Sequence, residues 1–290
     1  MPKKIILFIA VFLFFLNIFC WKEVFDLVKD ADILKVYFLD VGQGDSSFMQ
    51  TPEGHQILID GGPDASALEK LSSLMPFWDR TIDLVILTHP ESDHMQGLLD
   101  ILQRYKADYI LWTGVNRISP GYDVWLSALE KQKKMGAKII IADAGKRIKA
   151  GYVLIDTLYP LESTEGKELK NTSNDTCIVS KLIFGKNSFL LTGDISSTAE
   201  KEIVDSGKNV DSDVLKIAHH GSKYSTSDLF LENVIPKVAI ISVGTKNTYG
   251  HPTPEVLQRL EKFGIKVFRT DKDGDVKFIS DGNNLKLINN

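Results

Sequence analysis

The sequence has few cysteines and no excess of positive charge. Cys20 and Cys177 are the only cysteines among 290 residues, which excludes a disulfide framework and a cysteine-rich zinc site. The formal net charge of -4 does not predict the broad basic surface used in tight, nonspecific nucleic-acid binding. Any recognition of phosphate must therefore be local. Repeats and low-complexity tracts are also lacking, and the length suits one large domain or two fused halves.

The N-terminus carries one long apolar run. It extends from Ile5 to Trp21, about seventeen residues, which is near the lower limit for crossing a bilayer. Lys3 and Lys4 precede it and favour a cytoplasmic N-terminus. The run ends without the small residues of a cleavage site, so we favour an uncleaved anchor over a cleaved signal or a buried helix. We expect residues 1–30 to form anchor and linker, and residues 31–290 to lie at the extracytoplasmic face, or to be secreted if the segment is cleaved.

The rest of the chain opens each half with paired strands and then alternates helices with strands. After a short polar helix predicted over Lys22–Asp32, the stretches LKVYFLDV, SSFMQT and HQILID are predicted strands. This order predicts an α/β fold in which two mixed sheets pack face to face with helices outside, a four-layer αββα sandwich. The segment Leu161–Asn171 is predicted to be a flexible loop, and Asp271–Asp275 a turn between strands.

The stretch LTHPESDHMQGL gathers metal-binding side chains at one point. His89 follows a predicted strand over Asp83–Leu87, and Glu91, Asp93 and His94 come just before a predicted helix. Imidazole and carboxylate groups are good ligands for divalent ions. The alternative, that Ser92 or Asp93 only caps the helix, accounts for a single residue. We therefore predict a metal site here.

Further candidate ligands follow strands in the second half. Asp194 ends the stretch NSFLLTGD, His219 and His220 end SDVLKIAHH, and His251 lies in the loop after KVAIISV. Asp194 taken alone fits an ordinary turn equally well. Together with His89 these residues favour a site for two divalent ions between the halves, with Asp194 bridging the ions around an attacking hydroxide.

Seven motifs in one order carry a family resemblance: LDVGQGDSSF, ILIDGG, LTHPESDHMQGL, NDTCIVSKL, LLTGD, LKIAHHGSKYSTS and YGHPTPEVL. The third resembles the signature of the metallo-β-lactamase superfamily, and the whole order resembles the hydrolase domain of ComEC-type competence proteins, from about Leu34 to the C-terminus. The resemblance implies the αββα fold over residues 31–290, two divalent ions, and hydrolysis, often of phosphodiesters.

The resemblance also implies the site residues. It makes His219 the late histidine ligand, with His220 beside it. Glu91 stands where much of the superfamily has histidine, which shifts the expected metal toward manganese without excluding zinc. The expected ligands are His89, Glu91, Asp93, His94, Asp194 and His219; the expected catalytic residues are Asp93, Asp194 and His251; the expected substrate-binding or ligand-orienting residues are Gln43, Asp45, Asp60, Asn174, His220, Ser222, Lys223 and Ser225.

We therefore predict a metal-dependent phosphodiesterase, specifically a nuclease related to DNA uptake, whose substrate is single-stranded DNA. Asp93 would accept a proton, and His251 or Lys223 would steady negative charge on the phosphate. Two alternatives remain open: an envelope phosphodiesterase of the teichoic-acid or phosphorylcholine type, and a DNA-binding module without catalysis. A single apolar segment cannot conduct DNA across a membrane, so the uptake hypothesis includes a separate channel protein as partner.

Overall fold

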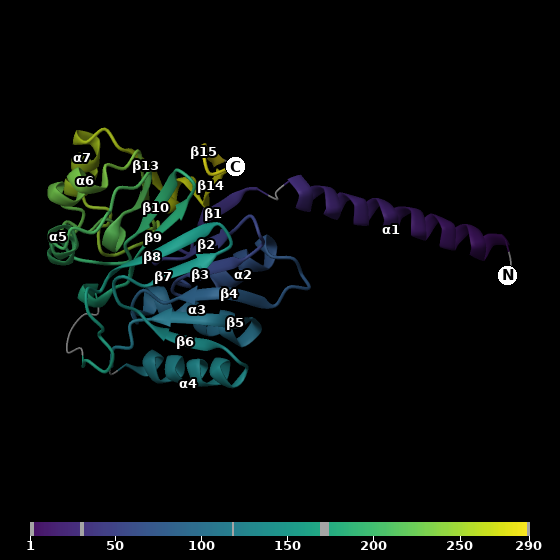
Figure 1. Cartoon of the computed structure of the whole chain (residues 1–290), viewed down its shortest axis with the longest axis horizontal. Coiled ribbons are helices and arrows are strands. Elements are labelled where there is room, and N and C mark those ends of the chain that lie inside the picture. Colours follow the sequence, from purple (N-terminus) through teal and green to yellow (C-terminus); the bar gives the residue numbers. More distant parts are fainter. Residues whose placement is uncertain (1–2, 30–31, 118, 169–173, 289–290) are drawn as a thin grey trace.

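The computed structural model describes residues 3–29, 32–117, 119–168 and 174–288, and two mixed sheets lie face to face within these ranges (Figure 1). One apolar cluster fills the space between the two sheets. A second cluster lies between the first sheet and its outer helices, and a third lies between the second sheet and its outer helices. This is the predicted four-layer αββα sandwich.

The first sheet has eight strands in the order β15-β14-β1-β2-β3-β4-β5-β6. Side chains of α2, α3 and α4, among them Leu71, Leu98 and Trp125, pack on its outer face. The strands are β1 Leu34–Phe38, β2 Ser47–Gln50, β3 Gln56–Ile59, β4 Thr81–Ile86, β5 Lys106–Trp112, β6 Lys138–Ile141, β14 Val276–Ser280 and β15 Leu285–Ile288, and the helices are α2 Ser66–Leu74, α3 Ser92–Arg104 and α4 Pro120–Lys134.

The second sheet has seven strands in the order β13-β12-β11-β10-β9-β8-β7. Ile203, Phe230 and Leu260 of α5, α6 and α7 pack on its outer face. The strands are β7 Arg147–Ala150, β8 Val153–Tyr159, β9 Val179–Phe184, β10 Asn187–Leu191, β11 Val214–Lys216, β12 Val238–Ile241 and β13 Lys266–Arg269, and the helices are α5 Ser197–Asp205, α6 Asp228–Val234, α7 Pro254–Lys262, α8 Thr270–Asp273 and the 3-10 turns η1 Asn174–Thr176 and η2 Ala218–Gly221.

Parallel pairing brings the carboxyl ends of several strands together. β4 pairs in parallel with β3 and β5, and β11 pairs in parallel with β10 and β12. The backbone N–H of Ile178 donates a 2.9 Å hydrogen bond to the carbonyl of Thr88, which joins the two halves just beyond the end of β4. The loops that leave these strands therefore meet at one edge of the sandwich.

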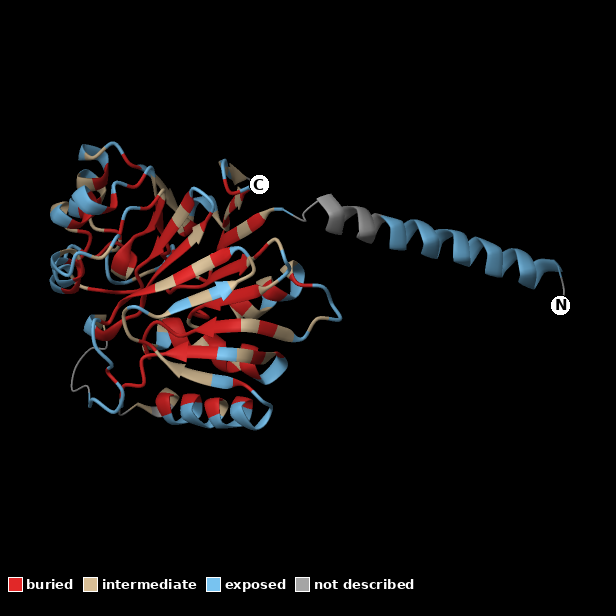
Figure 2. Ribbon diagram, in the orientation of Figure 1, coloured by how far each residue is buried: buried red, intermediate tan, exposed pale blue. Residues whose placement is uncertain are grey.

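The N-terminal region differs in part from the prediction. The structure has a single helix, α1 Lys3–Lys29, where an anchor and a separate polar helix over Lys22–Asp32 were predicted. No glycine or proline occurs between Trp21 and Lys29 to end the first helix, so it continues. The stretch Lys3–Trp21 is long and apolar enough to cross a membrane, and none of it is buried (Figure 2). The predicted boundary at residues 30–31 lies outside the described residues.

The structure adds detail to two predicted loops. Of the expected flexible loop, residues 169–171 lie outside the described residues, and the part before them is anchored: the buried Thr164 donates a 2.8 Å hydrogen bond to the carbonyl of Thr113. The expected turn over Asp271–Asp275 does lie between two strands, β13 and β14, and it contains the short helix α8. Asp271 forms a two-bond ion pair with Arg269 there, and this contact helps to hold the turn.

Candidate metal centre

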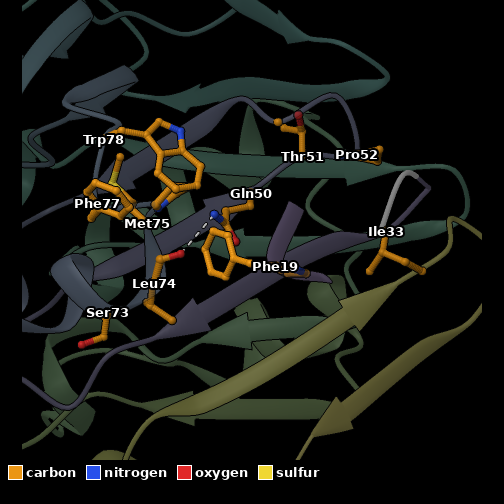
Figure 3. A pocket seen from close by; sticks show the side chains of 13 residues that line it. Phe19, Ile33, Gln50, Thr51, Pro52, Ser73, Leu74, Met75, Phe77 and Trp78 are labelled. Carbon is orange, nitrogen blue, oxygen red and sulfur yellow. Dashed lines mark hydrogen bonds between the residues drawn. The ribbon is translucent and has the colours of Figure 1, made fainter. Parts of the chain in front are cut away.

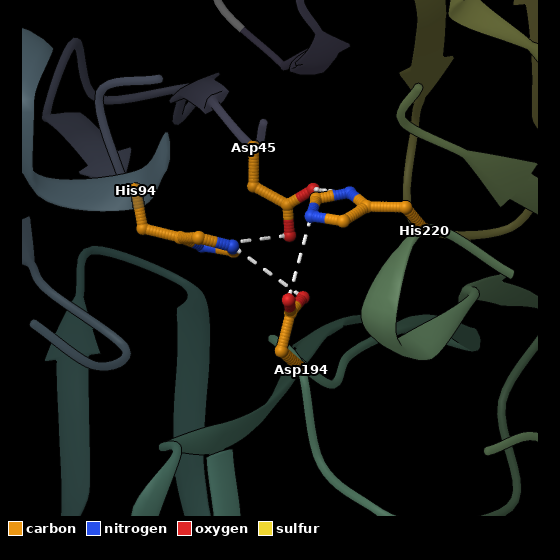
Figure 4. Close-up of side chains that lie close together, drawn as sticks. All are labelled: Asp45, His94, Asp194 and His220. Atoms are coloured by element: carbon orange, nitrogen blue, oxygen red, sulfur yellow. Dashed lines mark ion pairs between the residues drawn. The ribbon is translucent and has the colours of Figure 1, made fainter. Parts of the chain in front are cut away.

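Four buried side chains converge at the edge where the loops meet. Potential ligand atoms of Asp45, His94, Asp194 and His220 all lie within 4.8 Å of one another (Figure 4). Asp45 lies between β1 and β2, His94 in the first turn of α3, Asp194 after β10 and His220 after β11. Each half of the chain thus contributes one aspartate and one histidine, which is a suitable donor set for a divalent metal ion.

His94 is held in one orientation by Asp60. Its Nδ1 donates to Asp60 Oδ2 at 2.8 Å, and the backbone N–H and hydroxyl of Thr88 donate to the two oxygens of the same carboxylate at 2.8 and 2.7 Å. Both Asp60 and His94 are fully buried. This arrangement leaves Nε2 of His94 facing the cluster, and a carboxylate behind a histidine is the usual support of a metal ligand.

His220 is directed into the cluster by an unusual turn. His219 and His220 both have left-handed backbone conformations, with φ of 51° and 53°, and such conformations are costly for residues other than glycine. Nδ1 of His220 donates to the carbonyl of Ser242 at 2.9 Å. Nε2 lies 3.2 Å from Asp93 Oδ2 and 3.4 Å from Asp194 Oδ2.

His219, the expected ligand, lies outside the four-residue cluster. Its ring is half-buried, lies within 3.5 Å of the amide of Asn174, and packs edge-on to His251 at 5.7 Å. The geometry therefore favours His220 as the ligand and places His219 at the edge of the cavity. Neighbouring residues in a left-handed turn send their side chains in different directions, which the sequence alone does not reveal.

A buried lysine contacts the acidic side of the cluster. Lys216, at the end of β11, forms an ion pair with Asp45, and its Nζ lies 3.9 Å from Asp194 Oδ1 and 3.4 Å from the carbonyl of Gly193. Its side chain is 3% exposed, so the charge is kept only because it is paired. Lys216 was not among the expected site residues. A lysine within the apolar stretch Val214–Ile217 is the signal that could have indicated it.

Several polar atoms in the centre have no hydrogen-bond partner within the described parts of the chain. They are Asp45 Oδ1, His89 Nε2, His94 Nε2 and Asp194 Oδ1. The rings of His89 and His94 lie 4.2 Å apart, so two of these atoms belong to neighbouring imidazoles. His94 Nε2 lies 3.4 Å from Asp194 Oδ1, and Asp45 Oδ1 lies 3.4 Å from His220 Nδ1, so these atoms have charged neighbours but no well-aligned hydrogen bond. A buried polar group without a hydrogen bond costs about 1–3 kcal/mol. Divalent cations bound at this centre would give these atoms partners, so the residues present fit a metal site.

The pKa shifts of the buried groups reflect the close contacts between carboxylates and imidazoles in this centre. Burial opposes the charged form of each group, but Asp194 and Asp45 raise the pKa of His220, and Asp194, Asp45 and Asp60 raise that of His94, well above the usual range. The same two histidines hold the pKa of Asp194 well below its usual range despite burial. Burial lowers the pKa of His89 to about 3, so its imidazole is neutral and able to bind a metal.

The centre opens into a cavity of about 410 Å³. The cavity is lined by Gln43, Glu91, Asp93, Arg117, Asn174, Asp194, His219, His220, Tyr249 and His251. Glu91, an expected ligand, forms an ion pair with Arg117 at this rim and lies outside the four-residue cluster. Tyr249 is 70% exposed and stacks on His251 at 5.9 Å. Arg117 and Tyr249 are further site residues that the spacing of motifs did not indicate.

Three expected substrate contacts lie outside this lining. Ser225 is buried and donates to the carbonyls of Ala218 and Ser222, so it holds the loop together. Ser222 is also buried, and its hydroxyl accepts from the backbone N–H of Tyr224 at 3.4 Å. Lys223 is exposed and lies over the ring of Tyr224. The structure thus gives these residues local contacts, whereas Gln43, Asn174 and His251 reach the cavity.

The chain belongs to the metallo-beta-lactamase superfamily, whose description matches residues 39–245. It is 32% identical over 265 residues to the ComE operon protein 3 of Bacillus subtilis (strain 168), covering 84% of this chain and 33% of that protein. It is 31% identical over 240 residues to the competence protein ComA of Neisseria gonorrhoeae, covering 82% of this chain and 31% of that one. The chain thus spans about a third of the length of these relatives.

Solved structures agree on the fold. The metallo-beta-lactamase fold protein YhfI from Bacillus subtilis superposes with a TM-score of 0.57 at 15% identity, covering 86% of this chain and all of that one. The metallo hydrolase Igni18 from Ignicoccus hospitalis gives 0.53 at 19% identity, covering 84% and 98%. The predicted resemblance, the fold and the competence-protein relatives are confirmed. The buried Asp/His cluster in this fold indicates a divalent-metal site.

Proposed function

We propose that the chain is a metal-dependent phosphodiesterase that cleaves single-stranded DNA outside the cytoplasm. The observation that carries this proposal is the buried cluster of two aspartates and two histidines at the floor of a cavity of about 410 Å³. Similarity to competence proteins supports DNA as the substrate, and an exposed aromatic ring such as Tyr249 is a suitable platform for an unpaired base.

We assign two divalent ions, manganese or zinc, to this centre. His94, His220, Asp194 and either Asp45 or Asp93 would hold one ion; His89, the shared Asp194 and Glu91, after release from Arg117, would hold the other. When bound, such ions supply Lewis acidity and activate water for attack on phosphorus. The oxygen-rich donor set favours manganese without excluding zinc.

The remaining side chains have distinct tasks. Burial and neighbouring histidines lower the pKa of His251, and burial and His220 lower that of His219, so both rings are neutral near pH 7 and can accept a proton. Burial works against ionisation of Asp93, but His220 and His94 lower its pKa, which makes Asp93 a better ligand than base. Arg117 at the rim provides positive charge for a phosphate oxygen.

The test uses the full chain purified in a mild detergent with manganese or zinc. Single-stranded DNA, double-stranded DNA and bis(p-nitrophenyl) phosphate are supplied to the native chain, to Asp194→Asn and to the surface control Asp205→Asn. We expect cleavage of single-stranded DNA by the native and control chains and its loss in Asp194→Asn. DNA binding without product under either metal would reject catalysis and favour a binding module.

A second candidate, an envelope phosphodiesterase, is favoured by α1. A hydrolase anchored by an exposed apolar helix would work next to the cell envelope, whose teichoic acids are phosphodiesters. Adding p-nitrophenyl phosphorylcholine and purified teichoic acid to the panel separates the candidates. Their turnover without cleavage of DNA would transfer the proposal to the envelope substrate.

Under the DNA proposal we also infer a separate channel protein as partner. The two relatives are about three times as long as the matched region, so in them the matched part is one section of a longer chain, and a partner could take the place of the rest. Co-purification from the native membrane with crosslinking at exposed lysines is the direct measurement.

A further inference from the structure

The loop between α2 and β4 exposes two large aromatic rings. Phe77 is 75% exposed and Trp78 is 59% exposed, and the two rings meet edge-on at 4.8 Å between centroids. Large apolar side chains are normally buried, and a contiguous exposed pair marks a surface that binds something apolar.

The loop is held in a fixed shape. The backbone N–H of Asp79 donates to the carbonyl of Pro76 at 3.0 Å, and the carboxylate of Asp79 accepts from Thr81 and from the amide of Gln56. Arg80 lies over the ring of Tyr105 and donates to its hydroxyl. The charged groups next to the aromatic pair are therefore directed back to the domain, and the rings are the outermost part of the loop.

The loop lies where the chain comes from α1 into the domain. β1 begins at Leu34, its Lys35 pairs with Gln50 of β2, and Gln50 reaches the carbonyl of Leu74 at the start of the loop. A cavity of about 480 Å³ is lined by residues of both parts, including Phe19 and Ile33 on one side and Met75, Phe77 and Trp78 on the other (Figure 3).

The position of Phe19 sets the depth of this loop relative to a membrane. Phe19 lies two residues before Trp21, the last residue of the stretch that is apolar enough to span a bilayer. If that stretch crosses the bilayer, Trp21 reaches the interface between lipid and water. Phe77 and Trp78, which line the same cavity as Phe19, would lie at the same level, where tryptophan and other aromatic residues are enriched.

We propose that the Phe77–Trp78 loop is a second membrane contact, which inserts into the interfacial layer of the bilayer that α1 crosses. The proposal rests on α1 being an anchor and does not depend on the reaction catalysed. Its partner is the lipid surface itself. Two attachment points, the helix and the loop, would restrict rotation of the domain about its linker and hold the catalytic cavity in one orientation.

The test places a nitroxide label on the full chain in liposomes. Labels are introduced by Phe77→Cys, by Phe12→Cys within α1, and by Ile235→Cys as a matched control, since Ile235 is an apolar residue 69% exposed at the end of α6. All three carry Cys20→Ser, because Cys20 is exposed, whereas Cys177 is buried. Frequent collision of the label with oxygen indicates that the label lies in lipid, and frequent collision with a water-soluble nickel complex indicates that it lies in water.

We expect the label at position 77 to resemble that at position 12, with strong oxygen contact and at least a severalfold lower nickel contact than at position 235. Equal nickel contact at positions 77 and 235, with position 12 inserted, would overturn the proposal and would point to a protein partner for the loop. An uninserted label at position 12 would overturn it as well.

A second variant guards against misfolding and separates this proposal from the proposed function. Phe77→Ser with Trp78→Ser should keep hydrolysis of a small phosphodiester in detergent, while a label at Ser73→Cys, an exposed residue of the same cavity, becomes more accessible to nickel in this background. Insertion of the loop in a chain without hydrolase activity would support the membrane contact and reject the reaction. Accessibility of Ser73→Cys that is the same with and without the two serines would count against the loop.

Discussion

The two ends of β4 differ in which side chains they bury: polar atoms without hydrogen bonds are buried at one end, and large aromatic rings are exposed at the other. At its carboxyl end, polar atoms of Asp45, His94 and Asp194 are kept from water without hydrogen-bond partners among the described residues. Before its first residue, Phe77 and Trp78 are kept in water without apolar cover. Burial of unpaired polar atoms lowers the stability of the chain alone, whereas the exposed rings leave an apolar surface uncovered with little effect on folding. A partner outside the polypeptide would contact each group: a cation would bind the buried polar atoms and, as we propose, lipid would cover the exposed rings.

The largest expected effect comes from removing the shared carboxylate at the polar end. Asp194→Asn keeps the size of the side chain but loses the charge that holds His94 and His220. We expect kcat/KM on a phosphodiester to fall about 10³-fold, since metal-dependent charge stabilisation is worth several kcal/mol. Kinetics beside Asp205→Asn provides the check; comparable rates for the two variants would exclude the cluster from catalysis.

Loss of the residue behind His94 should have a smaller effect. Asp60→Asn leaves Thr88 a partner but weakens the orientation of His94, so the affinity for manganese should fall about 10–100-fold. Isothermal titration with metal measures this directly. Asp64→Asn, an exposed aspartate four residues further on, is the control. If both variants bind metal as the native chain does, Asp60 has no positioning role.

Acid should weaken the same centre. The raised pKa of His94 and of His220 means that protons occupy the metal-binding nitrogens at pH 6 and are released more readily at pH 8. In the metal-free chain these protons stabilise the fold at low pH, and that contribution is lost as the pH rises through the raised values. Added manganese should therefore raise the unfolding temperature more at pH 8 than at pH 6, with affinity about tenfold higher. An affinity independent of pH would contradict this.

Substitution of the aromatic pair Phe77 and Trp78 should have the smallest effect on the stability of the fold. Phe77→Ser with Trp78→Ser removes exposed rings, so the free energy of unfolding in detergent should change by less than about 0.5 kcal/mol. The matched comparison is Phe38→Ser, since Phe38 is fully buried between the sheets and its loss should cost several kcal/mol. Chemical denaturation of both variants tests whether the loop serves the fold or only a partner.

The sequence predicted the layers and the motifs of the fold because both depend on local patterns. Alternating strands and helices can be recognised within ten residues, and the acids and histidines follow strands whose carboxyl ends meet. The choice between His219 and His220 depends on two left-handed backbone conformations. The pairing of Glu91 with Arg117 depends on a residue 26 positions away. Such contacts arise from tertiary structure and have no local signal.

The length of β4 also has a consequence for reach. From Thr81 to Ile86, β4 covers roughly 15–20 Å, and in Figure 1 it runs in about the same direction as α1. If the aromatic loop lies in lipid as we propose, the strand would act as a spacer that holds the cavity away from the surface of the bilayer. The phosphodiesters of lipid headgroups in that membrane would then lie out of reach of the cavity.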